Sequence, residues 1–210
     1  DEHRVCALFA PAGYGKTSAL TAWADSDHRR VAWLSLTAAD HHSEHLARGL
    51  STALAEFETG AAAPDGHQVL VVDDVHLVGA AAAREVLRPF VENPPAGVRL
   101  LLAGRSDPGL GLSRLRAAGD VTVLDPAELS FTAAEVLALG RAIGTGLTDA
   151  QAAKLLEVTG GWPVAVRLAL LAAVPGDTPI APAPTSQIPH LPDYLFESVL
   201  AELPGELASF

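Results

Sequence analysis

The stretch APAGYGKTSA, residues 10–19, places two glycines two positions apart and follows them at once with Lys16 and Thr17. It comes directly after the short apolar run VCALFA (5–10). It leads into KTSALTAWADS, in which Leu20 and Trp23 are three positions apart, as on one face of a helix. An apolar run, a glycine turn and a helical pattern predict a strand, a loop and a helix in that order.

The alternation of apolar strand and helix continues as far as residue 125. Further strands are expected at VAWLSL (31–36), QVLVVDD (68–74), VRLLLAG (98–104) and DVTVL (120–124). The four consecutive apolar residues 69–72 are typical of a strand covered on both faces. Five strands with helical or long connections predict an α/β fold with a parallel, doubly wound sheet, and we expect the strand order 2-3-4-1-5.

The remainder of the chain has a different pattern. Three helices are expected in succession at 132–143, 148–159 and 162–173, and a proline-rich stretch follows them. We therefore expect a nucleotide-binding domain at 1–125, a helical lid domain at 126–174, a linker at 175–192 and the start of a further domain at 193–210. The helix after the second strand is expected to take Asp40 as its cap.

Composition excludes several classes of protein. Of the 210 residues 49% are hydrophobic, yet no run approaches the roughly 20 apolar residues that cross a bilayer. No secretory signal is visible, and the single cysteine, Cys6, can form no internal disulfide, so we expect a cytoplasmic protein without a membrane partner. A net charge of -11 argues against a nucleic-acid surface in this chain. The absence of methionine and the start at Asp1 suggest a piece of a longer protein.

Residues 10–17 satisfy the phosphate-binding loop pattern in its alanine-first form. Gly13 and Gly15 let the backbone turn its N–H groups inward, and the following helix points its positive end at the same place. Lys16 is expected to neutralise the β- and γ-phosphates, and the Thr17 hydroxyl to hold Mg²⁺. A plain strand-to-helix turn is the alternative, but the flanking strand and helix favour a phosphate cradle. Its expected residues are Ala12, Gly13, Tyr14, Gly15, Lys16, Thr17 and Ser18.

Two carboxylates end the apolar run VLVVDD. Asp73 is expected to contact Mg²⁺ at the carboxyl edge of the sheet, and Asp74 to orient or deprotonate the attacking water. Acids after a strand often only cap the next turn. The phosphate-loop pattern about 55 residues earlier favours the functional interpretation.

Two further segments are candidate parts of the site. Arg105 follows the fourth strand, where it would face the γ-phosphate as a sensor; an ion pair with Asp107 or another acid is the alternative. In TGGWPVAVRLA (159–169), the glycines and Pro163 fit the end of one helix and the start of the next. Trp162 and Pro163 would also offer flat apolar surface to an adenine ring.

The segment HHSEH (41–45) matches a pattern used by some zinc peptidases. No third ligand follows in a matching context, and polar residues are expected on the exposed side of a helix start. We therefore expect no zinc site there.

The segments APAGYGKT, VAWLSL, VLVVDDVHLV, LLLAGRSDP and TGGWPVAVRLA, in this order, resemble the nucleotide-binding part of the signal-transduction ATPases with numerous domains (STAND). The similarity is greatest to the large ATP-binding LuxR-type transcriptional regulators, and it covers nearly the whole chain. Ala10 replaces the first glycine of the stricter pattern, a variant tolerated in this group. The resemblance implies an AAA-like P-loop NTPase fold of the ASCE type, with a winged-helix-like domain beginning at 193–210.

The resemblance also implies a function. In that family ADP maintains an inactive state, ATP with an inducer permits self-association, and a C-terminal helix-turn-helix domain binds DNA. Carried over by position, Gly13, Gly15, Lys16 and Thr17 bind phosphates and Mg²⁺, Asp73 serves Mg²⁺ and Asp74 serves a slow ATP hydrolysis. Arg105 is then the sensor, and Trp162 with Pro163 lies at the base. The family's sensor repeats and DNA-binding domain are not in this chain, and the inducer is not indicated.

Two other functions remain open from the residues. A nucleotide-binding scaffold would use bound ADP without significant hydrolysis. A kinase or another P-loop enzyme would need an acceptor pocket that the sequence does not reveal.

Overall fold

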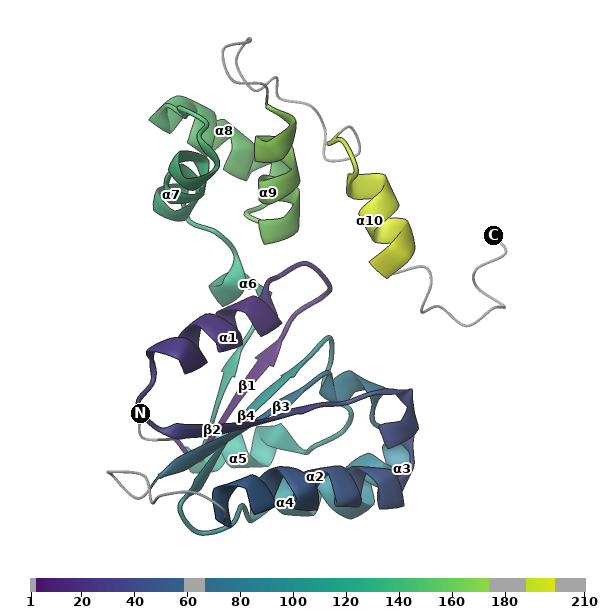
Figure 1. Cartoon of the computed structure of the whole chain (residues 1–210). Helices are drawn as coiled ribbons and strands as arrows, with labels where there is room; N and C mark the ends of the chain where they lie inside the picture. Colours follow the sequence, from purple (N-terminus) through teal and green to yellow (C-terminus); the bar gives the residue numbers. More distant parts are fainter. Residues whose placement is uncertain (1–2, 59–66, 174–187, 199–210) are drawn as a thin grey trace. The chain divides into compact units, whose positions relative to one another are not determined.

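The computed structural model describes residues 3–58, 67–173 and 188–198. A parallel five-stranded sheet forms the first half (Figure 1). Its order, β2-β3-β4-β1-β5, confirms the predicted topology. The strands are β1 (Val5–Phe9), β2 (Arg30–Ser35), β3 (Gln68–Asp73), β4 (Val98–Gly104) and β5 (Val121–Leu124). Residues 69–73 of β3 are all buried, as expected for a strand covered on both faces.

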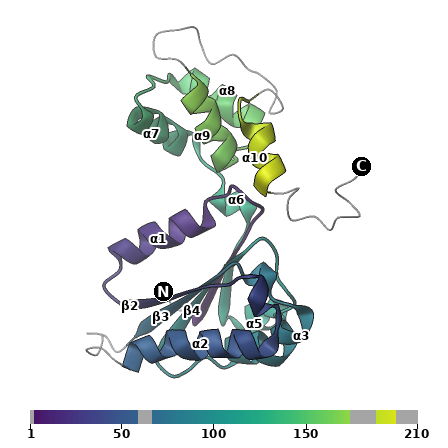
Figure 2. The ribbon, with the colours of Figure 1, turned by 45° about the vertical axis from the view of Figure 1, so that its right-hand side comes forward.

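Helices cover both faces of this sheet. Figures 1 and 2 show α1 on one face and α2, α3 and α5 on the other. The larger core lies on the second face, where apolar residues of the sheet pack against Leu46, Leu50, Leu87, Leu112 and Leu115. The helices of this part are α1 (Lys16–Ser26), η1 (Ala38–His41), α2 (Ser43–Glu58), η2 (Val75–Leu77), α3 (Ala80–Ala82), η3 (Ala83–Leu87), α4 (Arg88–Glu92), α5 (Leu112–Ala118) and α6 (Pro126–Leu129).

One helix prediction needs correction. Asp40 does not cap α2, which begins only at Ser43; it is the third residue of η1, where its carboxylate accepts from the backbone and hydroxyl of Thr37. The helical segment formed by α3, η3 and α4 is not uniform, because its middle section, η3, is a π-helix. Pro89 follows closely and lacks the N–H that a continuous α-helical ladder would require.

Helices alone make up the described part of the chain after α6. The helices are α7 (Ala133–Ile143), α8 (Asp149–Thr159), α9 (Pro163–Ala172) and α10 (Leu191–Ser198). Capping boxes at Thr132 and Thr148 explain where α7 and α8 begin, because each threonine hydroxyl accepts from the third residue of its helix. Val136, Leu155, Val166 and Leu170 form the centre of a separate small core.

The contacts divide the chain into two compact units. The first contains residues 1–11 and 16–126, and the second contains 12–15 and 127–210. The four residues 12–15 of the phosphate-loop pattern, expected in the first domain, thus group by contact with the helical second unit. None of the helices in the described ranges is long and apolar enough to cross a bilayer.

The proline-rich linker expected at 175–192 falls mostly outside the described residues. In its last part, Ile188 and Leu191 pack against Ala165 of α9. α10 accordingly begins at Leu191, earlier than the further domain expected at 193. Residues 199–210 of that domain are outside the described part.

Candidate functional site

The glycine loop joins β1 to α1 at the carboxyl edge of the sheet. Gly13 and Gly15 have φ angles of 78° and 72°, in the left-handed region that glycine adopts without strain. The α1 helix begins at Lys16, and its first turn has no acidic side chain. Because the first N–H groups of a helix lack partners within the helix, this end of α1 suits an anion. Ser18, also predicted in the cradle, is exposed in that first turn.

Lys16 is buried, and the loop itself binds its ammonium group. Its Nζ atom donates to the carbonyl oxygens of Ala10 at 2.7 Å and Pro11 at 3.1 Å. Burial lowers the pKa of Lys16 and the charge of Arg105 lowers it further, while Asp73 and Asp74 act in the opposite direction. A bound phosphate would offset the energetic cost of burying this cation, because it supplies negative charge beside it.

The two predicted Mg²⁺ ligands are hydrogen-bonded to each other. The Thr17 hydroxyl donates to Oδ2 of Asp73 at 2.7 Å, although the residues are 56 positions apart. The other oxygen of the buried Asp73 carboxylate accepts the backbone N–H of Asp74 at 2.8 Å. A hydroxyl and a carboxylate oxygen at this separation are the donor set that Mg²⁺ takes beside phosphate oxygens. The residues present therefore fit this metal ion.

Asp74 has an unusual backbone for a residue with a side chain. Its φ of 58° and ψ of 36° are left-handed. Burial raises the pKa of its carboxyl and the neighbouring Asp73 raises it further, against the opposing charges of His76, Lys16 and Arg105. Its Oδ1 lies 3.8 Å from Nδ1 of His76, a residue that the sequence interpretation did not assign to the site. The only signal in the sequence that could have assigned His76 to the site was its position two residues after Asp74.

The structure brings Arg105 to the same edge of the sheet as Lys16. β4 pairs with β1 so that Gly104 is opposite Phe9, and the Gly104 carbonyl accepts the N–H of Ala10 at 3.2 Å. Arg105 is the next residue, and its charge acts on both Lys16 and Asp74. Asp107, its expected alternative partner, accepts from the backbone N–H groups of Gly109 and Leu110.

The crest of the loop, Ala12–Gly15, has its partners at the start of α9. The indole Nε1 of Trp162 donates to the Ala12 carbonyl at 3.1 Å, and the backbone N–H of Val164 donates to the Gly13 carbonyl at 3.1 Å. Pro163 between them is buried. The sequence interpretation missed Val164, because no local signal indicates a contact between residues about 150 positions apart. The predicted contact of Trp162 and Pro163 with adenine stays a prediction.

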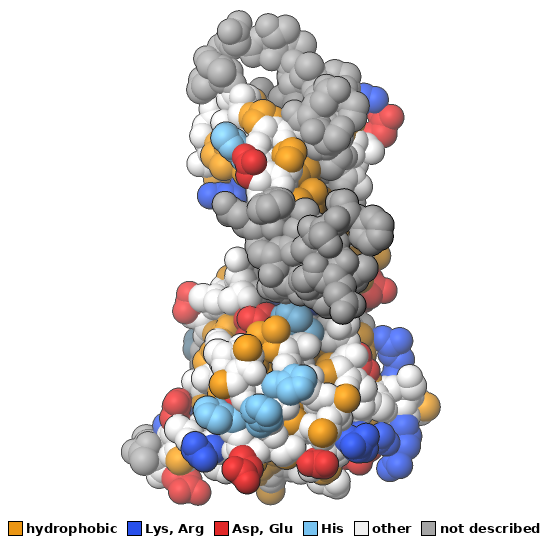
Figure 3. Space-filling model, turned by 90° about the vertical axis from the view of Figure 1, so that its right-hand side faces the viewer, with side chains coloured by type: hydrophobic (Ala, Val, Ile, Leu, Met, Phe, Trp, Pro, Cys, Tyr) orange, Lys and Arg blue, Asp and Glu red, His pale blue; other side chains and the backbone are white. Residues whose placement is uncertain are grey.

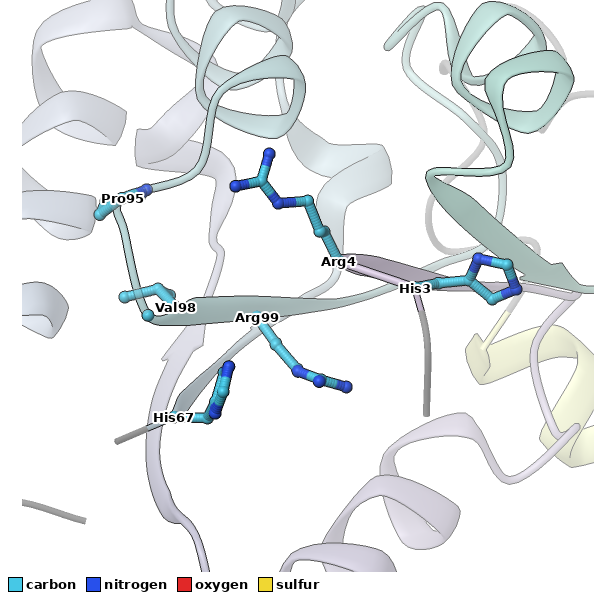
Figure 4. A pocket seen from close by; sticks show the side chains of 7 residues that line it. His3, Arg4, His67, Pro95, Val98 and Arg99 are labelled. Atoms are coloured by element: carbon cyan, nitrogen blue, oxygen red, sulfur yellow. The ribbon is translucent and has the colours of Figure 1, made fainter. Parts of the chain in front are cut away.

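Other polar clusters lie away from these residues. A cavity of about 120 Å³ is lined by His3, Arg4, His67, Pro95, Gly97, Val98 and Arg99, at the amino ends of the strands. The side chains of Arg4 and Arg99 point to opposite sides of β4 in this cavity (Figure 4). They therefore do not converge on one ligand.

The HHSEH segment is divided between two helices. His41 ends η1 and His45 lies in α2, so the two are not on one continuous helix. Histidine side chains gather on one face of the first unit (Figure 3), and the rings of His41 and His42 meet edge to face. Within the described ranges no group of three histidine, cysteine, aspartate or glutamate side chains could hold a metal ion.

Comparison with solved structures identifies the fold. A Walker-type ATPase of Pyrococcus abyssi superposes on 81% of this chain and 62% of its own, with a TM-score of 0.54 and 14% sequence identity. No model of a protein family matches the chain. The sheet order, the glycine loop and this likeness show that the chain has a P-loop NTPase fold.

Comparison of sequences finds relatives with a named biological role. The chain is 27% identical, over 241 aligned positions, to the HTH-type transcriptional regulator MalT of Yersinia pestis strain Pestoides F, and 26% identical to that of Yersinia enterocolitica. Each alignment covers 99% of this chain and 26% of the relative, so the chain spans about a quarter of their length. In sequence, the chain is therefore similar to one part of these MalT regulators.

Proposed function

We propose that this chain is the ATP-binding regulatory module of a signal-responsive transcriptional regulator. The observation that carries the proposal is the hydrogen bond between Thr17 and Asp73, beside the buried ammonium of Lys16. It joins the two motifs that P-loop ATPases need for a nucleotide with Mg²⁺, and it does so where the parallel strands end.

Each residue has a proposed role. The backbone N–H groups of residues 12–18 bind phosphate oxygens, and Lys16 neutralises the β- and γ-phosphates. Thr17 and Asp73 hold Mg²⁺, which when bound offsets the negative charge of the phosphates. Asp74 orients the attacking water or accepts its proton, and Arg105 senses the γ-phosphate. By resemblance alone, Trp162 and Pro163 form the adenine side.

We further propose that the module is a switch, in which bound ADP gives the inactive state and bound ATP the active one. Slow hydrolysis of ATP to ADP and phosphate then resets it. In the complete protein, the ATP state with an unidentified inducer would self-associate and bind DNA through a separate domain. The relatives support this proposal because they are named HTH-type transcriptional regulators. A regulator of this kind would work in the cytoplasm.

The test compares the two lysines of the chain. Lys16→Ala removes the cradle cation, while Lys154→Ala is the matched control, because Lys154 is an exposed residue of α8 that pairs with Glu157. Any nucleotide that copurifies is released by denaturation and identified by chromatography, and stripped protein is titrated calorimetrically with ATP and with ADP in Mg²⁺. We expect saturable binding in the unmodified chain and in Lys154→Ala, and none in Lys16→Ala. Equal affinity in all three proteins would refute the assignment of the site.

A further inference from the structure

The crest of the phosphate loop is held by two donors from the first turn of α9. These are the indole N–H of Trp162, which reaches the Ala12 carbonyl, and the backbone N–H of Val164, which reaches the Gly13 carbonyl, both at 3.1 Å. The N–H of Val164 is available because the first turn of a helix leaves its donors without helical partners. All these residues belong to the second compact unit.

These two hydrogen bonds also fix the groups that face a phosphate. In a trans peptide, the C=O of one residue and the N–H of the next share one plane and point in opposite directions. A donor on the Ala12 carbonyl therefore orients the N–H of Gly13, and a donor on the Gly13 carbonyl orients the N–H of Tyr14. The alternating backbone of such a loop can then keep its N–H groups turned to one side as an anion cradle.

Aromatic and apolar contacts fix the indole in turn. The ring centroid of Trp162 lies 6.5 Å from that of Tyr14 in the loop and 6.5 Å from that of Tyr194 in α10. Trp162 and Tyr194 also pack against the buried group formed by Ala165, Ile188 and Leu191. Because the indole has two aromatic neighbours and packs against this apolar group, its N–H donor has a defined position.

We infer that Trp162 is a positioning residue, which holds the phosphate loop in its anion-binding conformation through the Ala12 carbonyl. This inference rests on the proposed function for its purpose, but the hydrogen bonds that carry it join residues of the chain itself. It differs from the adenine contact implied by family resemblance, because the indole N–H acts here on the loop itself. The two roles predict different ligand dependences.

The first test needs no nucleotide. Hydrogen exchange of the loop amides, followed by mass spectrometry, compares the unmodified chain with Trp162→Phe, which keeps an aromatic ring but loses the donor. Trp23→Phe is the control, since that indole lies on α1 beneath the guanidinium of Arg29. Loss of one neutral hydrogen bond should speed amide exchange roughly two- to tenfold. We expect this faster exchange in residues 10–19 of Trp162→Phe and not in Trp23→Phe. Equal exchange in the three proteins would overturn the inference.

A measurement on the unmodified chain covers the case in which Trp162→Phe does not fold. Its three indole N–H signals can be resolved by NMR, with those of Trp23 and Trp33 identified by single Phe variants. We expect the Trp162 signal to exchange with solvent several-fold more slowly than that of Trp23. Exchange as fast as that of Trp23 would mean that the hydrogen bond to Ala12 is not maintained.

The second test separates this inference from the proposed function. ATP and inorganic tripolyphosphate, each with Mg²⁺, are titrated into the unmodified chain and into Trp162→Phe. Loop positioning predicts that both affinities fall by the same factor, whereas an adenine contact predicts a loss for ATP alone and would refute the inference. If neither ligand binds the unmodified chain, the proposed function fails, and the exchange measurements still decide whether Trp162 holds the loop.

Discussion

Gly13 and Gly15 have similar backbone conformations but differ in the space around their Cα atoms. Both have left-handed φ angles, 78° and 72°, so an alanine at either position would carry the backbone cost of roughly 1–2 kcal/mol. A Cβ atom at Gly15 would meet nothing within 4 Å. A Cβ atom at Gly13 would collide with Cγ1 of Val164 and would lie 2.9 Å from Nε1 of Trp162. Overpacking of this kind typically adds about 1–3 kcal/mol.

We therefore expect Gly13→Ala to destabilise the second unit by about 2–5 kcal/mol, and Gly15→Ala by about 1–2 kcal/mol. The assay is urea denaturation of nucleotide-free protein, followed by the fluorescence of Trp162 in a background with Trp23→Phe and Trp33→Phe. In this background the only tryptophan signal comes from the residue beside the loop. An unchanged slope with denaturant would show that the midpoints report stability.

Val164→Ala supplies the decisive control. It removes the Cγ1 atom that a Cβ at Gly13 would strike, so it should recover part of the loss in Gly13→Ala and none of the loss in Gly15→Ala. Recovery is partial because Cβ of Val164 would still lie 3.0 Å away. Equal losses for the two alanine variants, or no recovery with Val164→Ala, would refute the claim that the start of α9 packs against the crest of the loop.

Two further predictions concern Asp74 and Thr17. Because burial and Asp73 raise the pKa of Asp74, its ionised form is disfavoured in the folded protein, and the penalty is present above the folded pKa and absent below the unfolded value of 3.8. Asp74→Asn should thus raise the melting temperature more at pH 7 than at pH 3.5. The same variant should keep ADP binding and lose ATP turnover. Equal gains in melting temperature at both pH values would contradict the cause given for the pKa shift. Thr17→Val should reduce the increase in ADP affinity that Mg²⁺ gives and leave the affinity in EDTA unchanged, as measured by calorimetry. Thr21→Val, which loses a hydroxyl bonded to the Thr17 carbonyl, is its control, and an equal effect of Mg²⁺ on the two variants would argue against Thr17 as a ligand.

The sheet and the residues at its edge could be predicted because their signals are local. A buried strand such as β3 shows as a continuous apolar run, and parallel strands place their carboxyl ends at one edge. The known spacing of a phosphate loop then assigns Lys16 and Thr17, and the strand order brings Asp73 and Arg105 toward them. Each step needs only a short segment and one topological rule.

The support of the loop could not be predicted in this way. Trp162 and Ala12 are 150 positions apart, and their contact depends on how the second unit folds around α9. The glycines and Pro163 indicated a helix boundary correctly, yet nothing in that pattern says that the first-turn donors of α9 are used by the phosphate loop. The same limit applies to Asp40, which was expected to cap α2 and instead belongs to the capping box of η1.

The simplest alternative role for Asp73 and Asp74 is to cap the turn that follows β3. The backbone of Asp74 helps to decide between this role and a functional one. Asp74 occupies the cap position of η2, but its side chain makes no capping hydrogen bond. It adopts a left-handed backbone that costs most residues roughly 1–2 kcal/mol, and its carboxylate lies beside the buried Asp73. A residue that only ended a strand would gain nothing from this arrangement, since asparagine or glycine would fit the same backbone without the charge. A cost of this kind, located beside Lys16 and Thr17, is expected where chemistry needs a carboxylate, and it favours a role for Asp74 in hydrolysis over a role in folding.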